Sequence, residues 1–145
     1  MSDHAYCTYF DSAYAARGRV LIETLREQGD EGVVYVLALD EPAKATVSSW
    51  ADLKVHLINV GELEAKYPQL LNARANRNHM EYLFTLTPWL TQWTLDQVPP
   101  GAWATYLDAD MAFFASAESL YASANSGSVM IVEHRFTWEQ AWRRR

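Results

Sequence analysis

The sequence predicts an α/β domain with a mostly parallel central sheet, and three observations lead to this prediction. Short apolar runs of strand length alternate along the chain with longer segments of helical periodicity. The run Val33–Leu39 is almost continuously apolar, as is typical of a strand that is buried on both faces of a parallel sheet. Aspartates follow several strands, at the edge where such sheets bind ligands. We therefore expect one Rossmann-like domain.

The first half of the chain supplies three strands, each followed by a turn or a helix. The expected strands are His4–Phe10, Val33–Leu39 and Val55–Val60. Asp11 and Ser12 provide helix-start chemistry after the first strand, and Gly29 ends that helix. The triplet Asp40-Glu41-Pro42 follows the second strand as a turn or helix start, because proline suits a first helical position.

Two helical segments come next. The segment Glu62–Leu71 is helical at first and breaks or bends at Pro68. Asn78, followed three residues later by Glu81, resembles a capping box that opens a long apolar helix. Pro88 should kink this helix.

The remaining segments complete the α/β pattern. Trp103–Phe114 reads as a buried strand that runs into a loop. A short helix over residues 116–124, a turn at 125–127 and a last strand Ser128–Glu133 follow.

Length and composition limit the classes of protein that fit. The chain has 145 residues and a mass of 16.5 kDa, which suits one domain over residues 1–136 with a short basic tail at 137–145. A formal charge of −6 argues against charge-driven binding to nucleic acid or to anionic membrane. The start of the chain lacks a signal-peptide pattern, and no apolar run has membrane-spanning length, so we expect a cytoplasmic location, including the inner face of the membrane.

Asp108 and Asp110 are the strongest candidates for metal ligands. They lie one residue apart at the end of a strand, where two carboxylates can bind a hard divalent cation that also takes substrate phosphates. The simpler interpretation is a solvated turn with side-chain to backbone hydrogen bonds. Apolar residues on both sides of the pair make burial of unpaired carboxylates costly, and this favours the metal site.

Several familiar chemistries are excluded by missing motifs. The chain contains no G-x-G-x-x-G after its first strand, no G-x-x-x-x-G-K-[ST] and no G-x-S-x-G. Cys7 is the single cysteine, which excludes an internal disulfide. Because Cys7 lies within a predicted strand, we expect a small buried hydrophobic residue and not a nucleophile.

Five segments in order resemble the donor-binding half of a GT-A glycosyltransferase, and most closely the glycosyltransferase family 8-like proteins of bacterial surface-polysaccharide synthesis. The segments are C-T-Y-F-D-S-A-Y-A-A-R-G, V-Y-V-L-A-L-D-E, N-R-N-H-M-E-Y-L-F-T-L-T-P, T-Y-L-D-A-D-M-A-F-F and I-V-E-H-R-F. The resemblance covers His4 to about Phe136. It implies a GT-A nucleotide-sugar-binding fold and transfer of a sugar from a UDP-sugar to a hydroxyl acceptor with Mn²⁺ or Mg²⁺.

The resemblance also implies roles for individual residues. The loop after the first strand would hold the nucleoside through Thr8, Tyr9, Phe10 and Asp11. An acidic residue after the second strand, here Asp40, would contact base or ribose.

The remaining implied roles concern the diphosphate. Asp108 and Asp110 match the Asp-x-Asp motif that holds the metal on the diphosphate, and Arg77 matches a basic residue near the donor. A metal ion and an arginine would neutralise the leaving diphosphate.

Each implied role has a structural alternative. Asp11 could cap the first helix, and Asp40 beside Pro42 could form only a turn. Arg77 could be a solvated charge, and Glu81 is better explained as a capping-box partner than as a catalytic base. His134 follows the last predicted strand and is better explained as a hydrogen-bonded structural histidine than as a metal ligand.

The chain departs from the family at one large point. Family 8 enzymes supply a third metal ligand, commonly a late histidine, and much of the acceptor site from sequence beyond the equivalent of Phe136, whereas this sequence ends nine residues later. The domain is thus truncated relative to the family, either as a fragment, as a short protein or with a partner chain that supplies the rest. A homodimer or a partner chain would then cover the exposed side, with Trp138 and Trp142 as candidate contacts.

Three other classes compete with a complete transferase. A sugar-phosphate nucleotidyltransferase would have a glycine-rich loop after its first strand, and an Asp-x-Asp-x-Thr phosphatase would have threonine where this chain has Ala112. A truncated relic or partner-dependent module that binds nucleotide without turnover remains the main alternative. The sequence leaves the donor sugar, the acceptor and the stereochemical outcome open.

Overall fold

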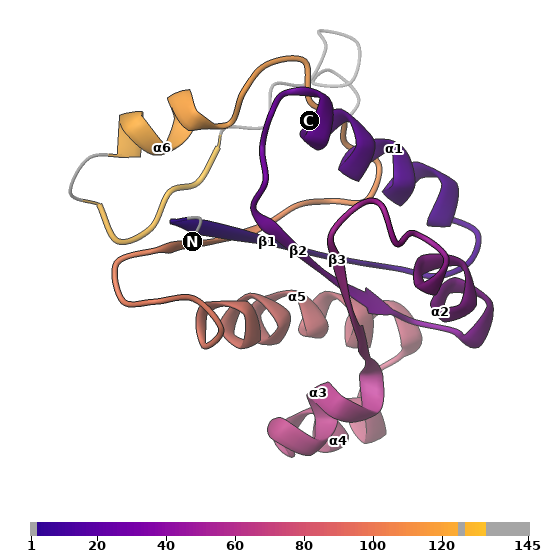
Figure 1. Ribbon diagram of the computed structural model, residues 1–145. Coiled ribbons are helices and arrows are strands. Elements are labelled where there is room, and N and C mark those ends of the chain that lie inside the picture. The colour runs from indigo at the N-terminus through magenta and orange to yellow at the C-terminus, as the bar shows by residue number, and fades with distance from the viewer. Residues whose placement is uncertain (1–2, 125–126, 133–145) are drawn as a thin grey trace, which may run out of the picture.

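The computed structural model describes residues 3–124 and 127–132, which form a three-layer α/β structure (Figure 1). The four strands are β1 (His4–Phe10), β2 (Val33–Ala38), β3 (Val55–Asn59) and β4 (Trp103–Tyr106). The six helices are α1 (Ala15–Glu27), α2 (Glu41–Ser48), α3 (Val60–Lys66), α4 (Gln69–Asn76), α5 (His79–Leu95) and α6 (Glu118–Ala124). The α/β class predicted from the sequence is confirmed.

The sheet is parallel throughout and has the strand order β3-β2-β1-β4. Ala5 of β1 lies opposite Val33 of β2 on one side and Ala104 of β4 on the other. The chain therefore builds outward from β1 to β3 and then crosses back, through α3, α4 and α5, to add β4 on the free side of β1. This reversal of strand order falls between β1 and β4.

Each face of the sheet is covered by helices and carries its own apolar core. In Figure 1, α1 lies above the sheet, α2 lies at its right-hand end, and α3, α4 and α5 lie below it. Val47 of α2 shares the core under α1, so α1 and α2 cover the same face of the sheet. Tyr6 and Phe10 of β1 face the upper core, whereas Cys7 faces the lower core with Leu86 and Leu90 of α5. Strands that are buried on both faces explain why the sequence shows continuous apolar runs.

Gly18 allows α1 to pack closely on the end of β1. A Cβ atom at this position would lie 2.4 Å from Cε1 of Phe10, so a larger residue would push the helix away from the strand. The helix itself begins at Ala15, three residues later than Asp11 and Ser12 suggested. Asp11 instead accepts a hydrogen bond from the Tyr14 backbone N–H (3.2 Å), which closes a turn before the helix.

The predicted turns and breaks around α2, α3 and α4 are largely confirmed. Asp40 is the N-cap of α2, and Pro42 occupies the second helical position. The third strand ends one residue earlier than predicted, because the Asn59 side chain caps α3 and Val60 is already helical. Pro68 separates α3 from α4, as expected.

The capping box predicted at the start of α5 is present. The Asn78 Oδ1 atom accepts the Glu81 N–H (3.0 Å), and a Glu81 carboxylate oxygen accepts the Asn78 N–H (3.0 Å). The helix continues through Pro88 to Leu95.

The prediction of a last strand over Ser128–Glu133 is wrong for the part that the structure describes. Residues 128–132 form no strand, although valine and isoleucine favour one, because they pair with no neighbouring strand within the described ranges. Glu133 and the predicted basic tail lie outside the described residues. Within those residues, no helix has the length and apolar character needed to cross a bilayer.

Candidate functional site

The carboxyl edge of the sheet gathers the candidate residues. Because all four strands are parallel, the loops after β1, β2 and β4 leave from the same edge, and these loops carry Asp11, Asp40 and the pair Asp108 and Asp110. Ligands of open α/β sheets bind in the crevice where the strand order reverses. Here that point lies between the ends of β1 and β4.

Two tyrosines mark the crevice between β1 and β4. The rings of Tyr9 and Tyr106 lie 5.8 Å apart, and the Tyr106 hydroxyl donates a hydrogen bond to Asp108 Oδ1 (3.1 Å). Thr87 of α5 donates to the Tyr9 hydroxyl (3.3 Å) from below. Burial, followed by the proximity of Tyr9 and Asp108, raises the pKa of Tyr106, so this hydroxyl stays protonated and acts as a donor. The contacts place Asp108 at the end of β1 as well as of β4.

The carboxylates of Asp108 and Asp110 are exposed, while the alanine between them is buried. A turn closed by the Met111 N–H and the Asp108 carbonyl oxygen (3.2 Å) presents both side chains on the outside of the loop. The expectation that neighbouring apolar residues would bury these carboxylates is therefore wrong, because Leu107 and Ala109 point inward and the aspartates between them point outward. The exposure leaves both aspartates accessible to a ligand.

A divalent cation fits this pair only with help from a ligand. Within the described residues, no group of three or more His, Cys, Asp or Glu side chains is arranged to hold a metal ion. Mg²⁺ is commonly bound by one or two carboxylates together with substrate phosphates and water. Asp108 and Asp110 supply the two carboxylates of that kind of site, in which phosphate oxygens and water complete the coordination.

The four residues predicted to hold the nucleoside fall into two groups. The side chains of Thr8 and Phe10 are buried in the core, with 0% and 3% exposure, so these residues could meet a ligand only through their backbone. Tyr9 is half-buried at the crevice, and Asp11 is half-buried at the end of β1. The alternation of side chains along a strand explains the division, because Thr8 and Phe10 share the face that packs under α1.

Asp40 has a structural role that is fully visible. One carboxylate oxygen accepts the Ala43 N–H (2.8 Å), and the other accepts the backbone N–H (3.1 Å) and the hydroxyl (2.8 Å) of Ser12. Hydrogen bonds from the Ala43 and Ser12 backbone N–H groups lower the pKa of Asp40. Asp40 thus joins the loops after β1 and β2, and it holds the ligand-side edge in shape whether or not it touches a ligand.

A hollow of about 390 Å³ lies beside Asp40, at the ends of β2 and β3. Its lining includes Asp40, Lys44, Asn59 and the backbone of Gly61. The lining combines the Lys44 ammonium, a hydrogen-bond donor, with the side-chain oxygens of Asp40 and Asn59, so the hollow offers both donors and acceptors to a polar ligand.

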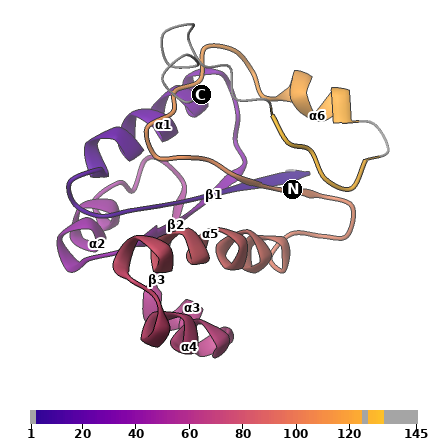
Figure 2. The same ribbon diagram turned by 180° about the vertical axis from the view of Figure 1, so that it is seen from behind.

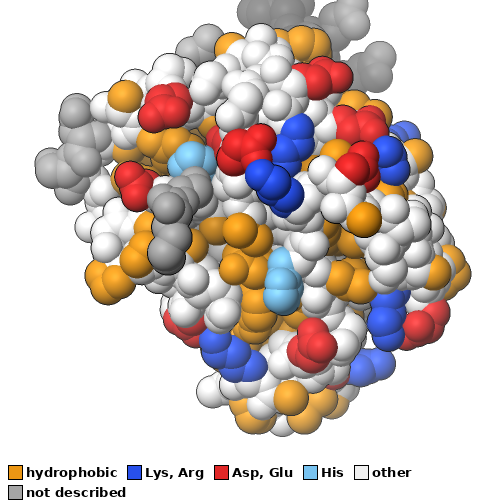
Figure 3. Space-filling view, viewed as in Figure 1, with side chains coloured by type: hydrophobic (Ala, Val, Ile, Leu, Met, Phe, Trp, Pro, Cys, Tyr) orange, Lys and Arg blue, Asp and Glu red, His pale blue; other side chains and the backbone are white. Residues whose placement is uncertain are grey.

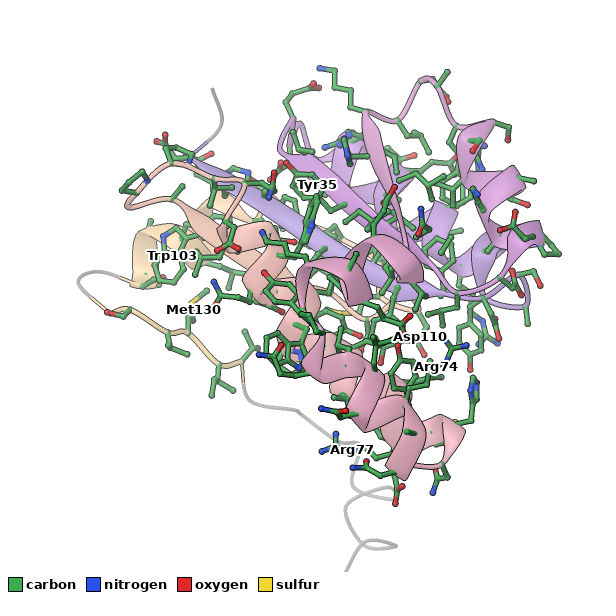
Figure 4. The ribbon with its side chains drawn as sticks, turned by 90° about the horizontal axis from the view of Figure 1, so that it is seen from below. Tyr35, Arg74, Arg77, Trp103, Asp110 and Met130 are labelled. Atoms are coloured by element: carbon green, nitrogen blue, oxygen red, sulfur yellow. The ribbon has the colours of Figure 1, made fainter. Side chains whose placement is uncertain are left out.

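A second hollow of about 420 Å³ adjoins the first and contains Arg77. Arg77 follows α4, is exposed, and donates a hydrogen bond to the Thr85 hydroxyl of α5. Figure 4 labels Arg74 and Arg77 beside α4 and α5. The hollow also includes His79.

Glu64, Arg74 and Tyr82 form a network in this second hollow that sequence reasoning missed. The buried Glu64 carboxylate accepts hydrogen bonds from the Tyr82 hydroxyl (2.7 Å) and from Arg74 (3.3 Å to each oxygen). Burial, together with the hydrogen bond to Glu64, raises the pKa of Tyr82. The only signal in the sequence was that Glu64 lies on the apolar face of a short helix. Because its partners Arg74 and Tyr82 are distant in sequence, Glu64 resembled an ordinary surface charge.

Two further predictions concern residues away from the crevice. Cys7 is completely buried, and burial raises the pKa of its thiol to about 11, which agrees with a structural residue and not a nucleophile. His134, Trp138 and Trp142 lie outside the described residues.

Comparison with known proteins finds relatives without an assigned activity. No protein-family model matches the chain. The chain is 24% identical over 127 residues to the uncharacterized protein YfnF of Bacillus subtilis (strain 168), an alignment that covers 88% of this chain and 41% of YfnF. It is 25% identical over 135 residues to the uncharacterized protein YfnD of the same organism, which covers 93% of this chain and 43% of YfnD. The chain therefore spans about two fifths of the length of these relatives.

Proposed function

We propose that this chain is the donor-binding part of a metal-dependent glycosyltransferase that uses a nucleotide-diphospho-sugar, with a UDP-sugar as the donor. One observation carries the proposal: exposed Asp108 and Asp110 lie at the point where the strand order of an all-parallel sheet reverses. A two-carboxylate site at such a crevice suits a cation that bridges to phosphate oxygens.

Different loops along the carboxyl edge would bind different parts of the donor. The loops after β1 and β2 would hold the nucleoside through Tyr9, Asp11 and Asp40, and through the backbone of Thr8 and Phe10. Asp108 and Asp110 would hold Mn²⁺ or Mg²⁺, which supplies positive charge to the diphosphate as the bond to the sugar breaks. Arg77 lines the hollow that adjoins the one beside Asp40, away from the Asp-x-Asp turn, and would add positive charge near the donor from that side, where its planar guanidinium suits phosphate oxygens.

The distances across the sheet agree with this division. Neighbouring strands lie about 4.8 Å apart, so the end of β4 is roughly 10 Å from the end of β2, two strands away. A nucleoside beside Asp40, at the end of β2, and a diphosphate at the end of β4 can thus belong to one extended ligand.

A non-catalytic module that binds nucleotide is the second candidate. One observation favours this module: within the described residues, the two carboxylates of the Asp-x-Asp turn have no third protein ligand beside them. The same residues would bind nucleotide and metal in such a module, but sugar transfer would need groups from a partner chain.

Calorimetric titration of UDP into the chain, with and without Mn²⁺, tests the proposal. We expect binding that depends on the metal, and we expect Asp110→Ala to abolish the metal dependence because one of two ligands is lost. Asp52→Ala is the matched control, since Asp52 is an exposed acid in the loop before β3, at the opposite edge of the sheet.

The outcomes separate the two candidates. Equal UDP binding by Asp110→Ala and Asp52→Ala would refute the metal role of the Asp-x-Asp turn. Metal-dependent UDP binding without release of UDP from any UDP-sugar tested would support the non-catalytic module over the enzyme.

A further inference from the structure

The Asp-x-Asp turn follows directly on the hydrogen-bonded part of the sheet. One residue past β4, the Leu107 N–H still donates to the Cys7 carbonyl oxygen of β1 (2.9 Å). Leu107 and Ala109 are both buried in the core under α1, whereas the Asp108 side chain between them is exposed. The sheet and its core therefore fix the backbone on either side of Asp108.

A second contact orients the Asp108 side chain. The Tyr106 hydroxyl donates a hydrogen bond to Asp108 Oδ1 (3.1 Å). Side chains two residues apart on an extended segment lie on the same side, so β4 itself places this donor beside the carboxylate. Within the described residues, Asp108 Oδ2 and both carboxylate oxygens of Asp110 make no hydrogen bond. Tyr106 thus engages one oxygen of Asp108 and leaves the other oxygen for a ligand.

The Tyr106 ring is held in turn by β1 and α5. It is half-buried and lies 5.8 Å from the ring of Tyr9. The Tyr9 hydroxyl accepts a hydrogen bond from Thr87 of α5 (3.3 Å), and both tyrosines pack against the core beneath the sheet. The hydrogen-bond donor to Asp108 therefore belongs to the packed structure and is not a mobile surface group.

The chain is fixed again shortly after Asp110. The Phe113 N–H donates to Thr24 Oγ1 of α1 (3.0 Å), while the Thr24 hydroxyl donates to the Val20 carbonyl oxygen (2.8 Å). The Phe113 ring packs edge-on against Tyr6 of β1, at 6.5 Å between ring centroids. In Figure 2 the chain that follows β4 turns back, rises past α1 and continues to α6. Contacts with separate elements thus close the turn at both ends.

This anchoring limits the geometry that the two carboxylates offer to a cation. Mg²⁺ requires near-ideal octahedral geometry, whereas Ca²⁺ accepts flexible geometry and often binds both oxygens of one carboxylate. A hydrogen bond on Asp108 Oδ1 competes with such two-oxygen binding and favours coordination through Oδ2 alone. The turn therefore suits the smaller ion with the stricter geometry.

We propose that Tyr106 is a positioning residue, which orients Asp108 so that the Asp-x-Asp turn binds UDP with Mg²⁺ in preference to Ca²⁺. The inference rests on the proposed function, in which Asp108 and Asp110 bind the metal. Tyr106 acts through the Asp108 carboxylate and needs no contact with the metal itself. Hydrogen-bond partners of metal-binding side chains commonly fix the orientation of the ligand in this way.

Acidic side chains elsewhere are less suited to a divalent cation. Figure 3 shows acidic and basic side chains close together on the face on which β3 lies in front. Among the ion pairs of the structure, Lys54 pairs with Glu31 and Lys66 pairs with Asp96 (2.6 Å). A carboxylate with a cationic partner is a poor site for a second cation, whereas the two aspartates of the Asp-x-Asp turn form no ion pair within the described residues.

Calorimetric titration of UDP in excess Mg²⁺, and separately in excess Ca²⁺, tests the proposal. We expect the wild-type chain to bind UDP more tightly with Mg²⁺. Tyr106→Phe keeps the ring and removes the hydroxyl, and it should raise the dissociation constant about tenfold with Mg²⁺ but about threefold or less with Ca²⁺. Tyr121→Phe is the matched control, because the Tyr121 hydroxyl is hydrogen-bonded to Thr105 of β4 and not to an aspartate.

The outcomes distinguish this inference from the proposed function. UDP binding by the wild-type chain that depends on neither metal would contradict the proposed function itself. Metal-dependent binding without a preference for Mg²⁺, or with the same preference in Tyr106→Phe as in Tyr121→Phe, would overturn the positioning role alone. Equal losses with the two metals in Tyr106→Phe would also overturn it, because a general structural defect does not discriminate between ions. Thermal denaturation should show that both variants remain folded.

Discussion

At the scale of single residues, Thr8 stands out because its hydroxyl lacks a hydrogen-bond partner within the described residues, although the side chain is completely buried. A buried hydroxyl without a partner loses its hydrogen bonds to water and costs about 1–3 kcal/mol. The position at the end of β1 also belongs to the segment proposed to hold the nucleoside. The effect of the unpaired hydroxyl on stability can be measured separately from ligand binding, since only the Thr8 backbone could reach a ligand.

We predict that Thr8→Val leaves the free energy of unfolding unchanged or raises it by about 1 kcal/mol, because valine has nearly the same shape and no hydroxyl to desolvate. Urea denaturation measures the change, and UDP binding should stay the same. Thr94→Val is the control: Thr94 is equally buried, but its hydroxyl donates to the Leu90 carbonyl oxygen (2.9 Å), so this variant should lose about 1 kcal/mol. A larger loss for Thr8→Val than for Thr94→Val would mean that the Thr8 hydroxyl has a partner.

Asp40 and Glu81 show how local chemistry and a site can share residues. Both were candidates for a ligand or a reaction, and both carboxylates are engaged at helix starts. Asp40 keeps its ligand-side position through Ser12, whereas Glu81 is held by the Asn78 N–H. Helix capping therefore accounts for every hydrogen bond that the Glu81 carboxylate makes within the described residues, but only for part of those of the Asp40 carboxylate, which also binds Ser12.

At the scale of elements, α5 links the site to the rest of the structure. Its first turn follows Arg77, and its middle supports Tyr9 through Thr87. The capping box determines where this helix begins, and thus where Arg77 lies relative to the second hollow.

We predict that Asn78→Ala lowers the free energy of unfolding by about 1 kcal/mol, because alanine has no side-chain oxygen to accept the Glu81 N–H, although its own backbone N–H can still donate to Glu81. Thermal or urea denaturation checks the value. Asn78→Asp is the control, since aspartate is an equally good N-cap and should retain the stability. If the alanine variant were as stable as the aspartate variant, the cap would contribute nothing to the fold.

At the scale of the whole molecule, the carboxyl ends and the amino ends of the strands differ in structure. The carboxyl edge presents exposed carboxylates and two hollows, whereas the amino edge is closed by a network around Asp30. The Asp30 carboxylate accepts hydrogen bonds from the Tyr6 hydroxyl (2.5 Å), a His4 ring nitrogen (3.0 Å) and the Gly32 N–H (2.8 Å). Because His4 also stacks on Tyr121 at 4.8 Å, the network joins β1, β2 and α6.

This network should make stability depend on pH. Burial alone would raise the pKa of Asp30, but the hydrogen bonds from Tyr6, His4 and Gly32 outweigh burial and hold the pKa below its ordinary value of about 4. A lowered pKa in the folded state means that the stabilisation is present above pH 4 and is lost as the pH falls through the folded-state value. We predict that Asp30→Asn lowers the free energy of unfolding by about 2–3 kcal/mol at pH 7.

The pH series supplies the check on this prediction. The difference between the wild-type chain and Asp30→Asn in urea denaturation should shrink as the pH falls below about 4, because Asp30 of the wild type becomes protonated there. Glu23→Gln is the control, because Glu23 is a partly exposed partner of Arg19 within α1 and should show a small effect at every pH. A constant difference for Asp30→Asn across the series would contradict the lowered pKa.

Much of the fold follows from local signals in the sequence. Apolar runs determined β1, β2 and β4, Pro68 determined the break between α3 and α4, and Asn78 with Glu81 determined the start of α5. These signals are readable because strand burial, a missing backbone N–H and a capping side chain act within a few residues. The placement of four aspartates after strands could likewise be predicted, because parallel strands end at one edge.

The tertiary structure decided what depends on partners that are distant in sequence. Residues 128–132 have strand-forming side chains, but a strand also needs a neighbour, and within the described residues none pairs with them. Local sequence could not show that Asp108 and Asp110 are exposed, because burial is a property of the packed layers. Glu64 became part of a site only when α3, α4 and α5 brought Arg74 and Tyr82 to it.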